Sequence, residues 1–315
     1  MRIYRDSVEW FYSSAILLMV TTSLLTGCSV HNTMTLMPTP VIYQDSTIDP
    51  YAHLDDARKS TRTKIFYATN RRRNKGEESV SYGNSKDSLL HLGSAIIRMG
   101  DKEESWEDIY DISRTGKQKN PVNLILEDVH ESSVIDPDFA PGGSLLPTGL
   151  QSFVDAINSE LDGVLDNEIM VYVHGTKVDF ANSAILTAEI DHFAGRDFAS
   201  LAFAWPSHQN IVSYLTGVDV RRARQSSGAL GKLLVFLAEH TRARQINVLS
   251  YSAGGKVATR ALSDIREKYS HLDSSALRKK LRIGSVVFAA IDVEVDIFLV
   301  RISAISELSE QVVLT

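Results

Sequence analysis

The sequence predicts an α/β fold, a doubly wound and mostly parallel sheet with helices on both faces. Two observations predict it. From residue 168 onward, short apolar runs alternate with stretches of helical periodicity, and strands joined by crossover helices lie parallel. The apolar runs contain few polar residues, as expected of strands whose two faces are both covered. The order and the composition of the elements therefore both indicate this architecture.

The expected elements follow one another in a regular order after three initial β-rich runs. Strands are expected at residues 65–68, 94–99, 122–126, 168–173, 200–204, 245–249 and 283–290, with a further strand beginning at 311. Helices are expected at residues 152–165, 181–193, 226–241 and 255–269. The polar stretches 70–86 and 100–120 are predicted to be loops.

Composition and motifs exclude several classes of protein. The net charge of −6 over 315 residues argues against nucleic acid as a partner, because such a surface needs clustered Lys and Arg. Basic clusters at residues 71–73 and 221–222 are short and are expected on solvated faces. The sequence has no glycine-rich dinucleotide loop, Walker loop or metal-binding histidine motif. No cofactor and no metal are therefore expected.

The first 27 residues resemble a secretory signal. An apolar run from Ala15 to Leu25 follows a start that contains basic residues, and it is too short to span a bilayer, which takes about 20 apolar residues. Leu25-Thr26-Gly27-Cys28 resembles the bacterial lipobox, whose cysteine is lipidated. This resemblance implies a bacterial cell-envelope protein anchored through Cys28, at the outer membrane and facing the periplasm, with the membrane as a partner. The alternative is an uncleaved interfacial helix with an incidental cysteine.

The remainder divides into a polar connection and one domain. Residues 28–60 contain three prolines and no sustained apolar period, so they are expected to form a tether. Residues 61–315 are expected to form the α/β domain, of which 61–150 is a β-rich N-terminal part.

The most informative stretch surrounds Ser252. It reads strand, tight turn and helix, with Ser250 before the serine and Gly254 after it. Such a turn presents a serine hydroxyl at the carboxyl end of a strand, as in a nucleophile elbow. The helix that follows directs its first amides, Ala253 among them, toward an oxyanion formed there. The alternative is a turn in which Ser252 only caps the helix.

A second strand runs into His174-Gly175-Thr176, upstream by the interval expected of a loop that supplies a second oxyanion amide. We assign the oxyanion hole to the amides of Thr176 and Ala253. His174 is expected to shape this loop, not to act as a base.

At this point the sequence resembles the DUF900 family of bacterial α/β-hydrolases, a group of esterase- and lipase-like proteins. The segments that carry the resemblance occur in family order: 66–71, 171–175, 203–207, the turn at Ser252, and 290–293 followed by Asp296 and Phe298. The resemblance implies a doubly wound α/β-hydrolase sheet with Ser252 as nucleophile.

The sequence departs from the family pattern near its last residues. By resemblance, residues 311–315 begin the strand that precedes the triad acid, and a histidine should follow, so the C-terminal strands are expected to be missing. Asp292 is the candidate substitute for the acid, although the family pattern favours a structural role for it. His271 precedes that strand, and His208 would be an unorthodox base. Without a base, a serine is a poor nucleophile.

The sequence thus favours a serine hydrolase that cleaves a small-molecule carboxylic ester through an acyl-enzyme on Ser252. The runner-up is an inactive, truncated hydrolase-like lipoprotein with a binding role or no role. A third reading is a structural lipoprotein in which the turn is coincidental.

Overall fold

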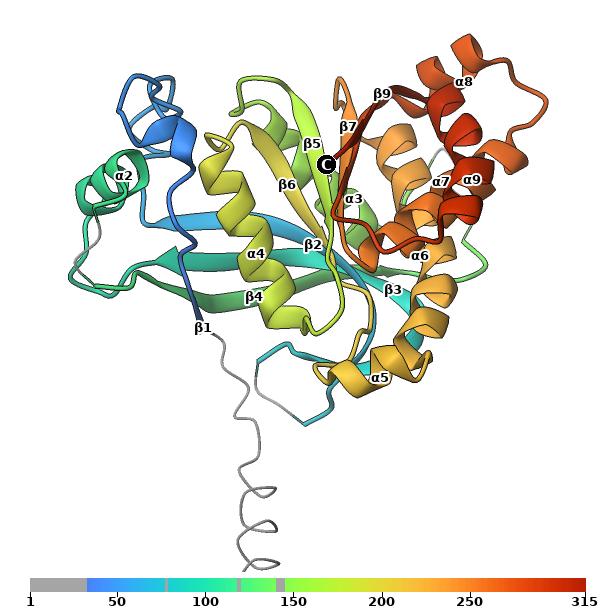
Figure 1. The fold of residues 1–315 in the computed structure, drawn as a ribbon, viewed down its shortest axis with the longest axis horizontal. Helices are drawn as coiled ribbons and strands as arrows, with labels where there is room; N and C mark the ends of the chain where they lie inside the picture. The colour runs from blue at the N-terminus through green and yellow to red at the C-terminus, as the bar shows by residue number, and fades with distance from the viewer. Residues whose placement is uncertain (1–32, 77–78, 118–119, 140–144) are drawn as a thin grey trace, which may run out of the picture. The chain divides into compact units, whose positions relative to one another are not determined.

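The computed structural model describes residues 33–76, 79–117, 120–139 and 145–315. The expected signal peptide and Cys28 lie outside these residues. In the described chain, a nine-stranded sheet has the order β1-β4-β3-β2-β6-β5-β7-β8-β9, as Figure 1 shows. The strands are β1 Thr33–Thr35, β2 Arg62–Arg73, β3 Tyr82–Met99, β4 Asn123–Ile135, β5 Glu168–Val173, β6 Phe198–Phe203, β7 Ile246–Tyr251, β8 Ile283–Ala289 and β9 Ser309–Leu314.

The sheet is mixed, with a parallel part and an antiparallel part. From β2 through β6, β5, β7 and β8 to β9, every neighbouring pair is parallel. The strands β3, β4 and β1 continue the sheet beyond β2 in antiparallel pairs. The predicted α/β class with a mostly parallel, doubly wound sheet is therefore confirmed, and every predicted strand lies within or next to an observed one.

Helices cover both faces of the sheet. They are α2 Trp106–Thr115, α3 Thr148–Leu161, α4 Phe180–Phe193, α5 Ile211–Leu215, α6 Val218–His240, α7 Gly254–Lys268, α8 Ser274–Leu281 and α9 Val295–Leu308, with a 3-10 turn η1 at Val41–Tyr43. Successive side chains of a strand point to opposite faces. Accordingly, Phe66 and Ala68 of β2 pack in the core that includes α3, α6 and α7, whereas Ile65 and Tyr67 pack in the core that includes α4.

The N-terminal half holds more regular structure than the sequence predicted. The strands β2, β3 and β4 extend well beyond the predicted runs, because their outer ends carry polar residues that pair along an antiparallel ladder. The predicted loop at 100–120 contains α2. A capping box starts this helix, in which Ser105 Oγ accepts from the Asp108 amide and the Asp108 carboxylate accepts from the Ser105 amide. Gly116 ends it in the left-handed region.

Residues 33–60 do not form the tether that the sequence predicted; they belong to the same compact unit as the rest of the described domain. Tyr51 is 2% exposed, its ring stacks on His192 of α4 and its hydroxyl lies 2.9 Å from His192 Nε2. The edge of the Tyr51 ring meets Trp106 of α2. The Met37 amide donates to the carboxylate of Glu189 on α4. These aromatic and polar anchors were missed because they follow no periodic pattern.

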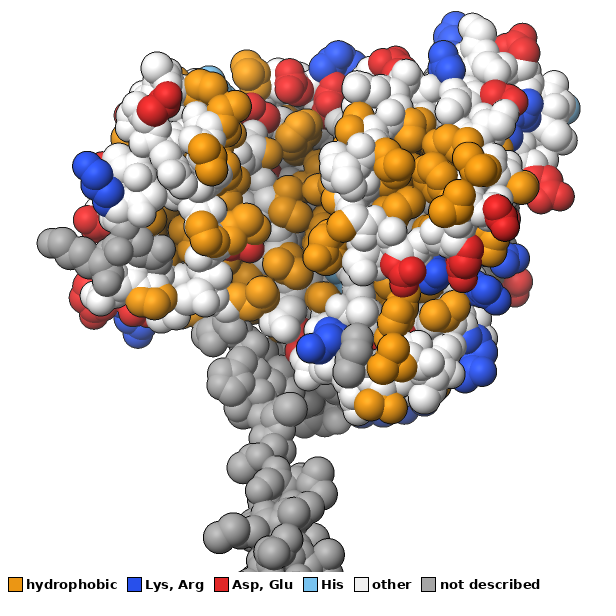
Figure 2. Space-filling view, in the orientation of Figure 1, with side chains coloured by type: hydrophobic (Ala, Val, Ile, Leu, Met, Phe, Trp, Pro, Cys, Tyr) orange, Lys and Arg blue, Asp and Glu red, His pale blue; other side chains and the backbone are white. Residues whose placement is uncertain are grey.

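Apolar side chains are exposed over much of the face shown in Figure 2, and two groups of them lie on helices. One group lies on α9, where Val295, Leu299 and Val300 are exposed, and the other lies on α5, where Val212 and Leu215 are exposed. No helix within the described residues has both the length and the apolar character needed to cross a membrane.

Replacing Tyr51 tests whether residues 33–60 belong to the folded domain. Tyr51→Ala should lower the free energy of unfolding by about 3–5 kcal/mol, because it removes a buried aromatic ring. The matched control is Val41→Ala in the same segment, where the side chain is 83% exposed and the change should stay within about 0.5 kcal/mol. Equal unfolding curves for both variants in urea would show that the segment does not contribute to the fold.

Replacing Glu189 tests its burial beneath the N-terminal segment. Burial raises the pKa of Glu189 to about 7, against an ordinary value of 4.5, while the bond from the Met37 amide opposes the shift. A raised folded-state pKa gives stability that is present below pH 4.5 and is lost as the pH rises through about 7. Glu189→Gln should therefore equal the wild type near pH 4 and exceed its free energy of unfolding at pH 8, by up to about 3 kcal/mol. A constant difference between the two proteins across this range contradicts the assignment.

Candidate functional site

The turn between β7 and α7 holds Ser252 in a strained conformation. Its φ is 49°, in the left-handed region that non-glycine residues rarely adopt. The Ser252 amide donates to the Ala289 carbonyl at 3.1 Å, and the Ser252 carbonyl accepts from the Gly255 amide at 3.0 Å. Backbone strain of this kind persists only where the surroundings fix it, and it gathers at functional sites. The turn thus has the geometry of a nucleophile elbow.

The elbow packs directly on the backbone of the loop after β5. A Cβ at Gly254 would lie 2.4 Å from the Val173 carbonyl oxygen and 2.6 Å from that of His174. A Cβ at Gly175 would lie 3.2 Å from Ser252 Cβ. Both glycines therefore allow the elbow and the β5 loop to approach closely. Ser250, where the usual motif has glycine, is buried and its hydroxyl donates to the Val287 carbonyl at 3.4 Å.

His174 lies beneath this loop and away from solvent. Its ring stacks on Trp205 at 5.2 Å, and Trp205 Nε1 donates to the His174 carbonyl at 2.7 Å. Its Nδ1 lies 2.7 Å from the Gly175 carbonyl oxygen. Burial, with the nearby charge of Arg71, lowers the pKa of His174 to about 3. The imidazole is therefore neutral at ordinary pH, and its contacts fix the path of the loop.

Arg71 corrects the expectation that the 71–73 cluster is a solvated face. Its side chain is fully buried, and burial lowers its pKa to about 9, which leaves it protonated at neutral pH. The guanidinium donates to the Val178 carbonyl at 2.6 Å and to Asn84 Oδ1 at 2.7 Å. Arg71 thus ties β3 to the loop that follows β5. Nothing in the run of three arginines distinguished it from Arg72 and Arg73, which are exposed.

Asp219 is a second buried charge that sequence reasoning missed. It lies in the first turn of α6 and is fully buried. Its carboxylate accepts from Thr176 Oγ1 at 3.2 Å and from the His208 amide at 3.2 Å. Asp219 therefore holds the loop after β5 against the loop after β6. The sequence offered one signal, an acidic residue in the first turn of a helix, but α6 begins at Val218, earlier than predicted.

Asp292, the candidate acid, lies close to the elbow. Its amide donates to the Ser252 carbonyl at 3.1 Å. Its side chain is 49% exposed, with Oδ1 3.8 Å from Lys256 Nζ. Burial and the charge of Glu294 raise the pKa of the Asp292 carboxyl above its ordinary value. The partner that the structure gives this carboxylate is thus a lysine of α7 and not a histidine.

No hydrogen bond joins Ser252 Oγ to a histidine among the described residues. His208, the unorthodox candidate, lies in the loop after β6, where its backbone bonds to Asp219 and its carbonyl accepts from the Lys177 amide. The ring of His271 lies near that of Tyr269, after α7. The described chain also contains no cluster of His, Cys, Asp or Glu that could hold a metal ion.

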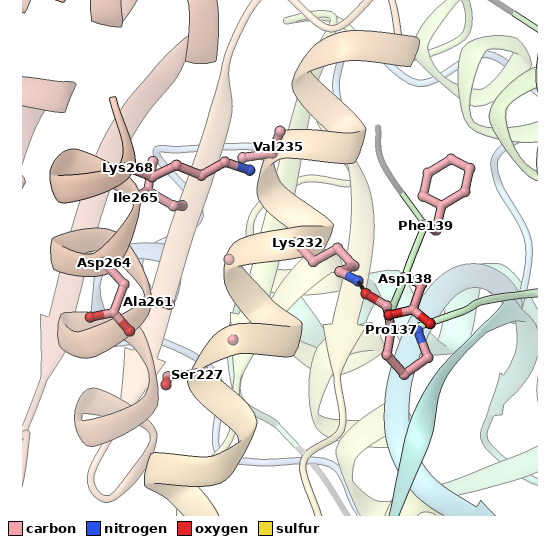
Figure 3. Close-up of a pocket in the computed structure, with 12 residues that line it drawn as sticks. Pro137, Asp138, Phe139, Ser227, Lys232, Val235, Ala261, Asp264, Ile265 and Lys268 are labelled. Atoms are coloured by element: carbon pink, nitrogen blue, oxygen red, sulfur yellow. Dashed lines mark hydrogen bonds between the residues drawn. The ribbon is translucent and has the colours of Figure 1, made fainter. Parts of the chain in front are cut away.

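A cleft of about 430 Å³ lies away from the elbow (Figure 3). It lies along α6, with α7 on one side and Pro137, Asp138 and Phe139 on the other. Lys232 Nζ donates to the Asp136 carbonyl at 3.1 Å, and Ser252 is not among the residues that line the cleft. The cleft therefore does not serve the candidate nucleophile.

Removing the Asp219 carboxylate tests the bridge between the two loops. Asp219→Ala leaves the Thr176 hydroxyl and the His208 amide without this acceptor, which should lower the free energy of unfolding by about 1–3 kcal/mol. Asp219→Asn keeps one acceptor oxygen and should lose less. Chemical denaturation measures both, and an Ala variant as stable as the wild type would contradict the role of this bridge.

The sequence comparisons agree with this geometry. A family model described as "Alpha/beta hydrolase of unknown function (DUF900)" matches residues 151–314, which include the elbow and the loops around it. No curated protein matched the chain. This family model covers more than half of the chain, so the chain belongs to this family of α/β-hydrolases of unknown function. The resemblance to the DUF900 family that the sequence indicated is therefore confirmed.

Proposed function

We propose that this α/β-hydrolase cleaves carboxylic esters through an acyl-enzyme formed on Ser252. The observation that carries the proposal is the left-handed Ser252 at the carboxyl end of β7, with φ of 49°. A serine that only capped a helix would need no such strain. The α7 helix begins two residues later, so its first amides and its dipole favour negative charge beside Ser252.

In this mechanism Ser252 Oγ attacks the ester carbonyl carbon while a base takes the hydroxyl proton. The amides of Thr176 and Ala253 donate to the oxyanion of the tetrahedral intermediate. When the intermediate collapses, the bond to the alcohol breaks and the alcohol leaves with the proton from the base. Water then attacks the acyl-enzyme by the same steps and releases the carboxylic acid. The contacts of Gly175 with the elbow and of Thr176 with Asp219 support this assignment, because they hold the donating loop beside Ser252.

The base is the part of the proposal that most needs an experiment. His208 is the candidate within the described residues, since it follows a strand whose carboxyl end lies at the same edge of the sheet as Ser252. Asp292 is retained as the candidate acid because its backbone bonds to Ser252. We also propose that Cys28 is lipidated and that the domain works at the bacterial cell envelope, on the strength of the signal-like N-terminal sequence.

Covalent labelling by a fluorophosphonate probe tests the nucleophile. Wild-type protein should be labelled at Ser252, because an activated serine reacts with this probe and an ordinary serine does not. Ser252→Ala should lose the label entirely. Ser306→Ala, which removes an exposed serine of α9, is the matched control and should retain it. Peptide mass spectrometry locates the adduct.

The labelling results distinguish an active serine hydrolase from a hydrolase fold with a binding role. Loss of labelling in His208→Ala, with the fold intact, would identify the base. A folded wild-type chain that takes no label would contradict the proposal and leave a hydrolase fold with a binding role.

A further inference from the structure

Two segments extend from the edge of the sheet at which Ser252 lies. The strands β2 and β6 are parallel, with Ala68 opposite Phe203, so the β2–β3 hairpin and the α5 segment after β6 both leave the carboxyl edge. Ser252 follows β7 at the same edge. Figure 1 shows the hairpin and α5 on the lower side of the molecule. The surface of these two segments therefore lies at the same edge of the sheet as the candidate site.

The helix α5 presents an apolar surface to solvent. Val212 is 53% exposed and Leu215 is 77% exposed. They are three residues apart, so they lie on the same face of the helix. Tyr214 packs against the core, and Asn210 Oδ1 caps the helix by accepting from the Val212 amide at 2.9 Å. The packing of Tyr214 and the Asn210 cap thus fix α5, and Val212 and Leu215 face the solvent.

Unpaired cations accompany this apolar tip. Arg72 and Lys75 of the hairpin and Arg221 at the start of α6 are exposed, and none of the three forms an ion pair within the described residues. Figure 2 shows the apolar tip over α5 with Lys and Arg side chains nearby. An apolar tip beside exposed cations is complementary to an anionic lipid surface, where the cations meet phosphate groups.

The chain length between Cys28 and the domain supports the same orientation. The first described strand, β1, begins at Thr33 on the lower side of Figure 1. A fully extended chain from Cys28 to Thr33 spans no more than about 18 Å. If Cys28 is lipidated, as proposed above, the start of β1 must therefore stay close to the bilayer.

We propose that α5, the described residues at the end of β2 and the start of α6 form a membrane-docking edge. Val212 and Leu215 enter the boundary between headgroups and acyl chains of an anionic bilayer, and Arg72, Lys75 and Arg221 contact the lipid phosphates. Docking does not require a reactive Ser252. One consequence rests on the proposed function: the site would face the bilayer, so its ester substrate would be a lipid-soluble one.

Nitroxide labelling of the full-length chain tests the docking without measuring activity. In a Cys28→Ser background, the L215C variant carries the label, and the protein is bound to vesicles of phosphatidylglycerol and phosphatidylcholine. The matched control is L299C, because Leu299 on α9 is similarly exposed, at 62%, and lies on another side of the molecule. The label at 215 should be relaxed severalfold more by oxygen, relative to a water-soluble nickel complex, than the label at 299.

Charge reversal provides the second arm of the test. Adding Arg72→Glu and Arg221→Glu to L215C, or using phosphatidylcholine vesicles alone, should return the label at 215 toward the water phase. Four outcomes would each overturn the proposal. The label at 215 could be as accessible to nickel as the label at 299, or the label at 299 could lie deeper than the one at 215. The spectrum could show spin–spin broadening from a second copy, or charge reversal could leave the label at 215 unchanged. None of these outcomes depends on Ser252 reacting with a fluorophosphonate probe.

Discussion

The close approach of two backbone segments determines the rest of this site. The first residue of α7, Gly254, lies so near the carbonyl oxygens of Val173 and His174 that no side chain fits between them. That contact sets the position of the elbow relative to the β5 loop. It also explains why a serine is tolerated in the left-handed region, because the β5 loop and the β8 backbone hold the turn from two sides. The geometry of the candidate oxyanion hole follows from this packing.

Around this contact, buried charged side chains hold the β5 loop through hydrogen bonds. The Arg71 guanidinium meets a backbone carbonyl of the loop from β2, and the Asp219 carboxylate meets the loop from α6. A buried charge is costly to leave without partners, so each fixes the backbone groups that it bonds. His174, neutral because of its burial, adds its stack on Trp205. The loop is therefore preorganised, which is what stabilising a developing oxyanion demands.

The sequence predicted the parallel strands and the elbow because both produce local patterns. Apolar runs such as the one in β5, and small residues around Ser252, are visible without knowledge of any tertiary contact. Arg71, Asp219 and Tyr51 could not be found in this way, because their roles depend on partners far away in the chain. The long antiparallel strands were also underestimated, since their polar outer ends resemble loops. Local chemistry thus located the candidate nucleophile, and distant contacts decide what supports it.

The most direct test of the central claim is to trap the acyl-enzyme itself. The full-length protein would be mixed with a short-chain nitrophenyl ester, quenched in acid and digested, and the peptide containing Ser252 would be weighed by mass spectrometry. The account predicts an added acyl group on Ser252 and none in Ser252→Ala. Release of nitrophenol by the folded protein without an adduct on Ser252, and unchanged in Ser252→Ala, would contradict it.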